Sequence, residues 1–327
     1  MRRIAVPLIV MSVAAAAVPG ARAVEVEDVL RALVRVEAEI PSDARTAAFL
    51  GTRREASGVV IDDAGLVLTI GYIILEAMSA TVTDADGLEV PADVVAYDYD
   101  SGFGLLRAIR PIAGAPLRLG DSDRLGPGDP ALVVAAGGAA AILPVRITRR
   151  DPFAGWWEYL LESAIYTAPA HPAWSGAALV GADGRMLGIG SLRLDDAGPG
   201  GAEESGNLFV PINLLKPILG ELLAEGRRAA APRPWMGLFT RDIASHVVVM
   251  RVIEDGPGAR AGVQEGDVIA EVDGRAVADM ADLFRKVWAL GEAGVEVPLT
   301  VARGPARQRI VVRSSDRYRY LKLDPSY

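Results

Sequence analysis

One short stretch of the sequence places a serine where a nucleophile would be presented. The segment PAWSG, with Ser175 as its fourth residue, precedes two apolar runs, AALV and RMLGIGSL, that flank the turn GADG. This pattern predicts a hairpin with the serine hydroxyl at its entrance. A serine hydroxyl attacks only when a neighbouring base removes its proton in the transition state. The sequence must therefore supply a base if Ser175 is to react.

The chain offers only two histidines as ordinary bases, His171 and His246. His171 lies on the same loop as Ser175 and is either a local base or a solvated loop residue. A base also needs an orienting partner and the correct face of the nucleophile. Asp98 and Asp100 are either such orienting groups or ordinary turn residues. His246 is interpreted as a residue at a strand edge.

The composition excludes several other kinds of site. The 327 residues include no cysteine and carry a formal net charge of -8, so disulfides, thiolate metal sites and a basic nucleic-acid surface are not expected. Neither glycine-rich segment, AAGGAAA or AGPGGAEESG, has the strand and helix context of a nucleotide-binding loop. No His, Asp or Glu residues recur at metal-ligand spacing. We therefore expect neither a metal nor a cofactor.

The first 23 residues have the composition of a secretory signal peptide. Two arginines precede an apolar run, and the segment ends in Ala21-Arg22-Ala23, which is typical of a cleavage site. The alternative, an uncleaved anchor, is disfavoured because the run is shorter than the ~20 residues that span a bilayer. No later segment is long and apolar enough to span. The sequence thus predicts export, with the periplasm as the destination.

The remaining chain divides into two domains. Residues 24–39 are predicted to form an amphipathic helix, and from Ser57 short apolar runs alternate with Asp/Gly turns, as in a closed or sandwiched all-β domain. A helix over 213–226, capped by Asn213 and Gly226, follows. The predicted boundaries are given by residue number: signal peptide 1–23, β-domain 24–226, linker 227–234, second domain 235–315 and tail 316–327.

The second domain is predicted to hold one helix between short strands. The segment DMADLFRKVWAL begins with Asp279, which is suited to cap its first turn. Apolar residues recur at helical spacing, and this stripe is expected to pack in the core, with a subset facing a groove. The residues of the stripe are Met280, Leu283, Phe284 and Val287.

Several motifs in order resemble the HtrA/Deg serine proteases of the bacterial envelope. The segments SGVVIDDAGLVLT, LRLGDSDRLGPGDPALVVAAG and FVPINLLKPIL are similar to successive parts of that family's protease domain, and WMGL with PGARAGVQEGDVIAEVDGRAV is similar to its PDZ domain. The resemblance covers residues 56–313. It implies a mainly β fold, a chymotrypsin-like double β-barrel followed by one α+β PDZ domain.

The resemblance assigns the catalytic positions one by one. The serine of the family's GNSGG motif corresponds to Ser175, within AWSGA. The histidine position is occupied by Tyr72, in TIGYII, and the aspartate position by Gly102, in SGFGLL. A tyrosine with a pKa near ~10 remains protonated at neutral pH and is unsuited to be a base. Ser175 is therefore interpreted as the remnant of a triad.

The oxyanion hole implied by the resemblance is also altered. Its donors are the N–H of the serine and the N–H two residues earlier, where the family has glycine and this chain has Ala173. A Cβ there restricts the backbone conformations that glycine allows. The double change Tyr72→His with Gly102→Asp is the substitution that would re-create the family's triad.

The PDZ resemblance implies peptide recognition. The terminal carboxylate of an extended peptide is expected to bind backbone N–H groups of the loop formed by Trp235, Met236, Gly237 and Leu238. Leu283 and Val287 are expected to line the groove. Alternatively, the chain's own tail, DRYRYLKLDPSY, occupies it. The aromatic run GWWEY either contacts peptide or packs a strand.

Three functions follow from these observations. The leading hypothesis is an exported pseudoprotease that binds C-terminal or unfolded peptides, as a scaffold or regulator in envelope protein quality control. The second is an active serine endopeptidase that uses Ser175 with a non-standard base. The third is a structural subunit that assembles with an active relative. The resemblance also implies a possible homotrimer formed through residues 24–51.

Overall fold

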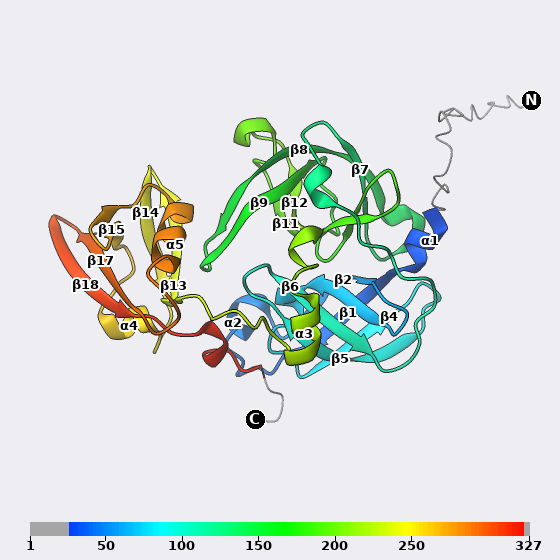
Figure 1. Cartoon of the computed structure of the whole chain (residues 1–327), viewed down its shortest axis with the longest axis horizontal. Coiled ribbons are helices and arrows are strands. Elements are labelled where there is room, and N and C mark those ends of the chain that lie inside the picture. The colour runs from blue at the N-terminus through cyan, green and yellow to red at the C-terminus, as the bar shows by residue number, and fades with distance from the viewer. Residues whose placement is uncertain (1–25, 324–327) are drawn as a thin grey trace, which may run out of the picture.

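Two six-stranded barrels and a smaller sheet domain make up the molecule (Figure 1). The structure is a computed structural model that describes residues 26–323. The predicted signal peptide, residues 1–23, lies outside the described residues. Among the described residues, no helix has the length and apolar character needed to cross a membrane.

The first barrel closes in the strand order β1-β2-β3-β6-β5-β4, with β1 pairing both β2 and β4. The helix predicted over residues 24–39 is wrong in its second half, because the chain becomes a strand at Leu33 and is bonded on both edges. The elements are α1 (Val26–Arg31), β1 (Leu33–Glu39), α2 (Ala47–Leu50), β2 (Arg53–Val60), β3 (Leu66–Ile70), η1 (Gly71–Ile73), β4 (Ser79–Thr83), β5 (Glu89–Tyr97) and β6 (Phe103–Ala108).

The second barrel closes in the order β10-β11-β12-β9-β8-β7. Its longest hairpin, β8–β9, extends from the barrel to the sheet domain (Figure 1). The elements are η2 (Ser122–Arg124), β7 (Pro130–Val134), η3 (Gly138–Ala141), β8 (Ile142–Gly155), β9 (Tyr159–Ala168), β10 (Ala178–Val180), β11 (Met186–Leu194), η4 (Pro199–Gly201) and β12 (Gly206–Pro211).

The helix predicted after the second barrel is shorter than expected. A 3-10 turn, η5 (Ile212–Leu214), comes first, and α3 (Leu219–Glu225) begins only after Pro217. Asn213 is therefore not its N-cap, since proline breaks the hydrogen-bond ladder between them. The predicted C-cap is confirmed, because Gly226 adopts the left-handed conformation with φ 71°.

The C-terminal sheet domain, called here the PDZ-like domain, has the strand order β13-β14-β15-β17-β18. Asp279 caps α5 by accepting a 2.8 Å hydrogen bond from the N–H of Asp282, as predicted. The elements are β13 (Leu238–Ile243), β14 (His246–Val252), α4 (Pro257–Ala261), β15 (Val268–Val272), β16 (Arg275–Ala276), α5 (Met280–Trp288), β17 (Glu296–Arg303), β18 (Ala306–Arg313) and η6 (Arg317–Arg319).

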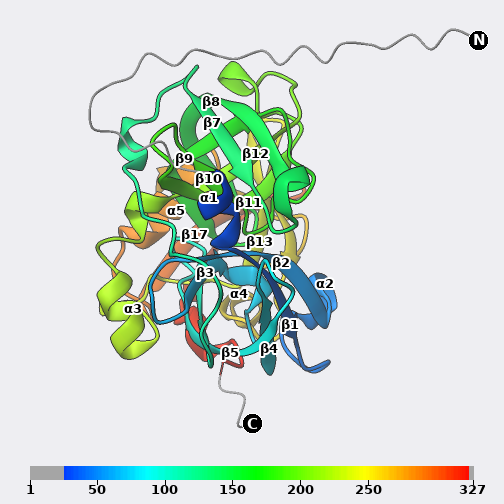
Figure 2. The same ribbon diagram turned by 90° about the vertical axis from the view of Figure 1, so that its right-hand side faces the viewer.

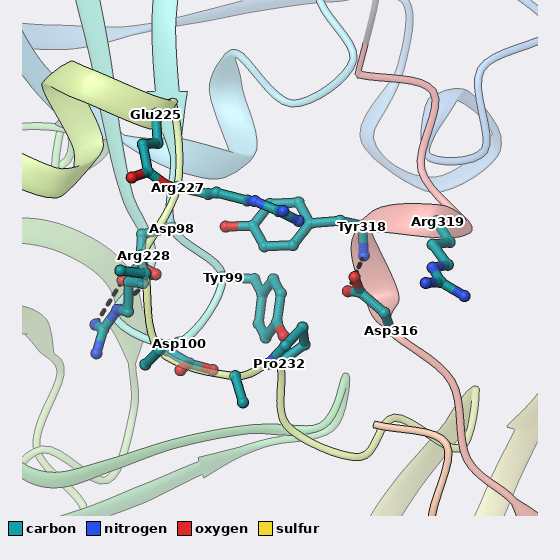
Figure 3. Close-up of a pocket in the computed structure, with 13 residues that line it drawn as sticks. Asp98, Tyr99, Asp100, Glu225, Arg227, Arg228, Pro232, Asp316, Tyr318 and Arg319 are labelled. Carbon is teal, nitrogen blue, oxygen red and sulfur yellow. Dashed lines mark hydrogen bonds and ion pairs between the residues drawn. The ribbon is translucent and has the colours of Figure 1, made fainter. Parts of the chain in front are cut away.

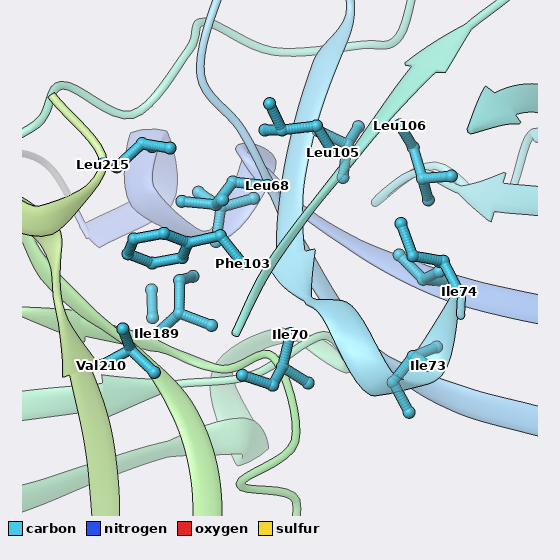
Figure 4. Close-up of a cluster of buried hydrophobic side chains, with 14 of the residues drawn as sticks. Leu68, Ile70, Ile73, Ile74, Phe103, Leu105, Leu106, Ile189, Val210 and Leu215 are labelled. Atoms are coloured by element: carbon cyan, nitrogen blue, oxygen red, sulfur yellow. The ribbon is translucent and has the colours of Figure 1, made fainter. Parts of the chain in front are cut away.

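The main hydrophobic core crosses the junction between the barrels. Phe103, at the start of β6, lies in one cluster with Ile189 and Val210 of the second barrel (Figure 4). The short helix α1 lies between the two barrels (Figure 2) and buries Val29. This continuous core fixes the position of one barrel against the other, which is the condition for building a site from residues of both.

The tail packs on the first barrel. Leu321 is buried with Leu75, Tyr97 and Tyr99, and the Tyr318 hydroxyl donates a 2.7 Å hydrogen bond to the carbonyl of Tyr97. The described part of the tail, up to residue 323, is thus tied to the barrel surface.

Removing the Phe103 ring should destabilise the barrels strongly. The side chain is fully buried, and Phe→Ala changes in cores cost about 3–5 kcal/mol because they leave a cavity. Phe103→Ala is therefore expected to lower the free energy of unfolding, measured with urea, by that amount. Met78→Ala, at a side chain that is 59% exposed, is the control and should change it by no more than about 0.5 kcal/mol. Equal losses in both variants would contradict this account of the core.

Candidate active-site remnant and peptide-binding groove

The Ser175 loop is pressed against the first barrel. The N–H of Ser57, in β2, donates a 2.9 Å hydrogen bond to the carbonyl of Ser175. The next residue, Gly176, has φ 68°, and a Cβ on it would lie 1.9 Å from the Ser57 carbonyl oxygen. Only glycine fits this close approach. The serine is consequently held at the barrel junction, with its hydroxyl facing η1.

Tyr72 meets the serine from the first barrel. It lies in η1, directly after β3, and its hydroxyl oxygen is 2.8 Å from Ser175 Oγ. The Tyr72 hydroxyl also donates to the carbonyl of Ser191 at 3.0 Å. Because the phenol proton points to the Ser191 carbonyl, the phenol oxygen accepts a hydrogen bond from the Ser175 hydroxyl. Burial raises the pKa of Tyr72 to about 12, so at neutral pH the phenol is neutral and retains its proton.

The position assigned to the aspartate is unfavourable for any side chain. Gly102 has φ 84°, and a Cβ on it would lie 3.1 Å from the hydroxyl oxygen of Tyr159. That hydroxyl donates a 2.6 Å hydrogen bond to the carbonyl of Ser101. Tyr159 therefore occupies the space beside Gly102. The double change Tyr72→His with Gly102→Asp meets both backbone strain and Tyr159.

The two histidines are both engaged elsewhere. His171 is buried; its Nδ1 accepts the N–H of Ala173 at 3.0 Å and its Nε2 donates to the carbonyl of Ala141 at 3.1 Å. Burial lowers its pKa, which favours this neutral tautomer. Both ring nitrogens thus bind backbone rather than Ser175. His246, exposed at the start of β14, donates to the carbonyl of Ala244.

The same contact engages the Ala173 N–H, which the resemblance assigns to the oxyanion hole. Because the N–H of Ala173 points to His171 Nδ1, it is not available to an oxyanion beside Ser175. Sequence reasoning had located the change at Ala173 but attributed it to the added Cβ. The structure gives a second cause, the neighbouring imidazole.

Asp98 and Asp100 hold the linker rather than the Ser175 site. Asp98 is buried and forms a two-bond ion pair with Arg228, at 2.8 and 2.6 Å. Asp100 forms an ion pair with Arg233, in which Oδ2 of the carboxylate lies 3.4 Å from Nε of the guanidinium. These carboxylates and Tyr318 of the tail line a cavity of about 600 Å³, and Figure 3 shows how their side chains lie. Both aspartates thus fasten the interdomain segment to the first barrel.

The predicted carboxylate-binding loop of the PDZ-like domain binds a carboxylate of this chain. The N–H groups of Met236 and Leu238 each donate a 2.9 Å hydrogen bond to the side chain of Glu158. Glu158 lies at the tip of the β8–β9 hairpin and is only 6% exposed. Gly237, between the two donors, has φ 74°, so both N–H groups can turn to one anion.

The predicted groove residues share a buried cluster with another residue of the same hairpin. Leu283 and Val287 of α5 are buried in the cluster that includes Met236, Leu238 and, from the second barrel, Leu160. The hairpin thus supplies a carboxylate and an aliphatic side chain to the PDZ-like domain.

An apolar cavity of about 300 Å³ separates this hairpin from the serine. Its walls include Trp156, Trp157 and Tyr159 of the hairpin, together with Tyr72 and Trp174 beside the serine. The aromatic run that the sequence singled out therefore forms a hairpin tip between the two candidate sites. In residues 26–323 no cluster of three or more His, Asp or Glu side chains is arranged to hold a metal ion.

Comparison with known families gives two matches along the chain. A trypsin-like peptidase domain matches residues 56–189, and a PDZ domain matches residues 234–313. The predicted fold, a mainly β double barrel followed by a PDZ domain, is confirmed. We call the matched residues, 234–313, the PDZ domain from here on.

Curated relatives are periplasmic proteases. The probable periplasmic serine endoprotease DegP-like of Pseudomonas fulva is 26% identical over 298 residues, which cover 84% of this chain and 60% of the relative. The periplasmic pH-dependent serine endoprotease DegQ of Escherichia coli is 28% identical over 262 residues, which cover 76% of this chain and 56% of the relative. The chain thus spans little more than half the length of these relatives.

Solved structures show the same fold at lower identity. The HtrA-type protease AlgW with decapeptide superposes with a TM-score of 0.54 at 21% identity, covering 89% of this chain and 97% of the other. The serine endoprotease from Yersinia pestis gives a TM-score of 0.53 at 21% identity, covering 89% and 96%.

Sequence reasoning missed two residues of these sites, Glu158 and Tyr159. Both lie within GWWEY, which was noticed only for its aromatic content. A glutamate among aromatic residues in a hairpin was the available signal, since a buried carboxylate requires donors. Its partners lie about 80 residues later, and no local pattern connects them.

Glu158 should make the stability of the protein depend on pH. Burial raises its pKa from the ordinary 4.5 to about 7, against the opposing effect of the Leu238 and Met236 N–H groups. The folded state therefore binds this proton more tightly than the unfolded chain. The resulting stability is complete below about pH 4.5 and is lost as the pH rises through about 7.

Comparison with Glu158→Gln, which does not titrate, isolates this effect. The wild-type protein should lose about 3 kcal/mol relative to the variant between about pH 4.5 and about pH 8. The measurement is the free energy of urea unfolding of both proteins across that range. A difference that stays constant with pH would contradict the buried, proton-binding Glu158.

Proposed function

The chain belongs to the HtrA family of trypsin-like serine proteases with one PDZ domain, and on that premise we propose that it is an exported pseudoprotease that binds peptides. Its ligands are C-terminal or unfolded peptides, and its setting is protein quality control in the cell envelope, as a scaffold or regulator. The observation that carries the proposal is the Tyr72 hydroxyl, which lies where a base would act on Ser175 and retains its proton.

Loss of the base removes most of the catalytic power of a serine protease. Mutational studies of such triads place the loss on the order of 10⁶ in turnover when the base is absent. Here the Ala173 N–H is also directed away from the oxyanion position, and Tyr159 fills the space beside Gly102. Each of these features supports a role in binding rather than in hydrolysis.

Peptide binding is supported by the geometry of the PDZ loop. Two N–H groups on either side of Gly237 converge on one carboxylate, which is the geometry that a terminal carboxylate requires. The curated relatives are named periplasmic, which supports export of this chain as well. A homotrimer formed through residues 24–51 and association with an active relative belong to the same proposal.

The alternative function is an active serine endopeptidase. The retained Ser175 and the names of the relatives favour it. It requires a base that neither Tyr72 nor His171 provides in the arrangement described above.

Ser175 is expected not to react with a serine-directed fluorophosphonate probe. The purified mature protein and Ser175→Ala should be labelled equally weakly, and neither should cleave casein, because no base takes the serine proton. An active trypsin sample serves as the positive control, and circular dichroism confirms that both proteins are folded. Labelling and cleavage that disappear together in Ser175→Ala would overturn the pseudoprotease proposal in favour of the endopeptidase.

The PDZ domain should prefer peptides with a free terminal carboxylate. We expect a fluorescein-labelled peptide ending in leucine to bind the full mature chain about 10-fold or more tightly than the same peptide with a C-terminal amide. The amide lacks the charged oxygen that accepts hydrogen bonds from the two N–H groups. This loss corresponds to a difference of at least ~1.4 kcal/mol in binding free energy between the two peptides. Fluorescence anisotropy measures both affinities. Equal binding of the acid and the amide would contradict recognition through the Trp235–Leu238 loop.

A further inference from the structure

The peptide site of the PDZ domain already has an occupant from the same chain. The carboxylate of Glu158 accepts hydrogen bonds from Leu238 N–H at 2.9 Å and from Met236 N–H at 2.9 and 3.2 Å. These are the donors that a peptide's terminal carboxylate would use. One set of N–H groups cannot serve both carboxylates, so a peptide and Glu158 exclude each other.

Two further contacts resemble those of a bound peptide. The carbonyl of Trp156, in the hairpin tip, accepts a 3.0 Å hydrogen bond from the N–H of Thr240 in β13, as an added strand would. Leu160 is 5% exposed and belongs to the buried cluster of the PDZ domain. The hairpin thus supplies a carboxylate, a main-chain acceptor and an aliphatic side chain to one site.

An ion pair holds the hairpin to the opposite wall of the groove. Arg285 of α5 donates to both carboxylate oxygens of Glu162 in β9, at 3.0 and 2.5 Å. Both side chains are largely exposed, so this pair is screened and contributes little compared with the buried contacts of Glu158.

The backbone at Glu158 indicates that its side chain is needed there. Gly155 pairs with Tyr159 across a three-residue loop, and Glu158, the last loop residue, has φ 56°. Glycine is the residue favoured at this left-handed position in such loops. A glutamate is disfavoured by its Cβ, and the hydrogen bonds of its carboxylate offset that cost.

We propose that the β8–β9 hairpin is an internal ligand of the PDZ domain, and that a peptide binds only by displacing Glu158 from the Trp235–Leu238 loop. This inference rests on the proposed peptide-binding function and adds its regulation. The affinity measured for a peptide is then the intrinsic affinity multiplied by the small fraction of molecules in which the hairpin has left the groove. Weakening the internal ligand should increase the affinity.

The test compares peptide affinity in three variants of the full mature chain. Glu158→Gly removes the carboxylate and keeps the hairpin loop, because glycine suits its backbone conformation. Glu158→Gln keeps the size but leaves a single acceptor oxygen. Glu203→Gln, at an exposed position in the second barrel, is the matched control. The ligand is the fluorescein-labelled peptide ending in leucine with a free carboxylate.

We expect Glu158→Gly to bind this peptide about 10-fold or more tightly than the wild-type protein, with Glu158→Gln between them and Glu203→Gln unchanged. An affinity of Glu158→Gly equal to or weaker than that of the wild type would overturn the internal-ligand inference while leaving peptide binding intact. Absence of binding in every protein would overturn the proposed function itself.

Hydrogen exchange without any peptide tests the internal contact separately. The amides of Met236 and Leu238 should exchange slowly in the wild type and about 10-fold or more faster in Glu158→Gly, because their acceptor is removed. Equal exchange rates in the two proteins would show that Glu158 does not hold the loop, and would overturn the inference whatever the peptide assay gives.

Discussion

A buried carboxylate determines how the parts of this molecule sit together. Glu158 is taken out of water by the PDZ domain, and a carboxylate tolerates such burial only where donors meet it. Those donors are the N–H groups of Met236 and Leu238, so the second barrel and the PDZ domain are joined through the loop that we propose binds peptides. The aspartates of the first barrel secure the linker on its other side through Arg228 and Arg233. The contacts of Glu158 therefore do two things at once. They hold the PDZ domain against the second barrel, and they occupy the N–H groups of the loop that we propose binds peptides.

At the junction of the barrels, the polar groups near Ser175 form hydrogen bonds with the main chain instead of removing a proton from the serine. Where acid–base chemistry would require a group that takes a proton, Tyr72 offers a phenol whose proton is held by a backbone carbonyl. His171, the nearest imidazole in the sequence, has both nitrogens bound to the main chain. The serine loop itself is well fixed by the close contact of Gly176 with Ser57. The result is an ordered site whose hydrogen bonds are satisfied within the protein.

Much of this arrangement was predictable from the sequence because it depends on local patterns. Short apolar runs with Asp/Gly turns predicted an all-β domain, closed or sandwiched, and the resemblance to a known family added the double barrel. Asp279 and Gly226 predicted where helices begin and end. Local patterns also misled, since the apolar residues from Leu33 fit a helix as well as a strand and only pairing with β2 and β4 decides between them. The contacts of Glu158 and Tyr159 link segments distant in the chain. No spacing rule reports such contacts, and they required the folded structure.

The packing of Tyr159 beside Gly102 links two positions that lie far apart in the chain. A side chain introduced at position 102 would meet the Tyr159 hydroxyl, which is bonded to the Ser101 carbonyl. Tyr159 would first have to become smaller, and that change would itself leave a hole in a buried aromatic stack with Trp157. Position 102 can therefore accept a larger side chain only together with a change at position 159.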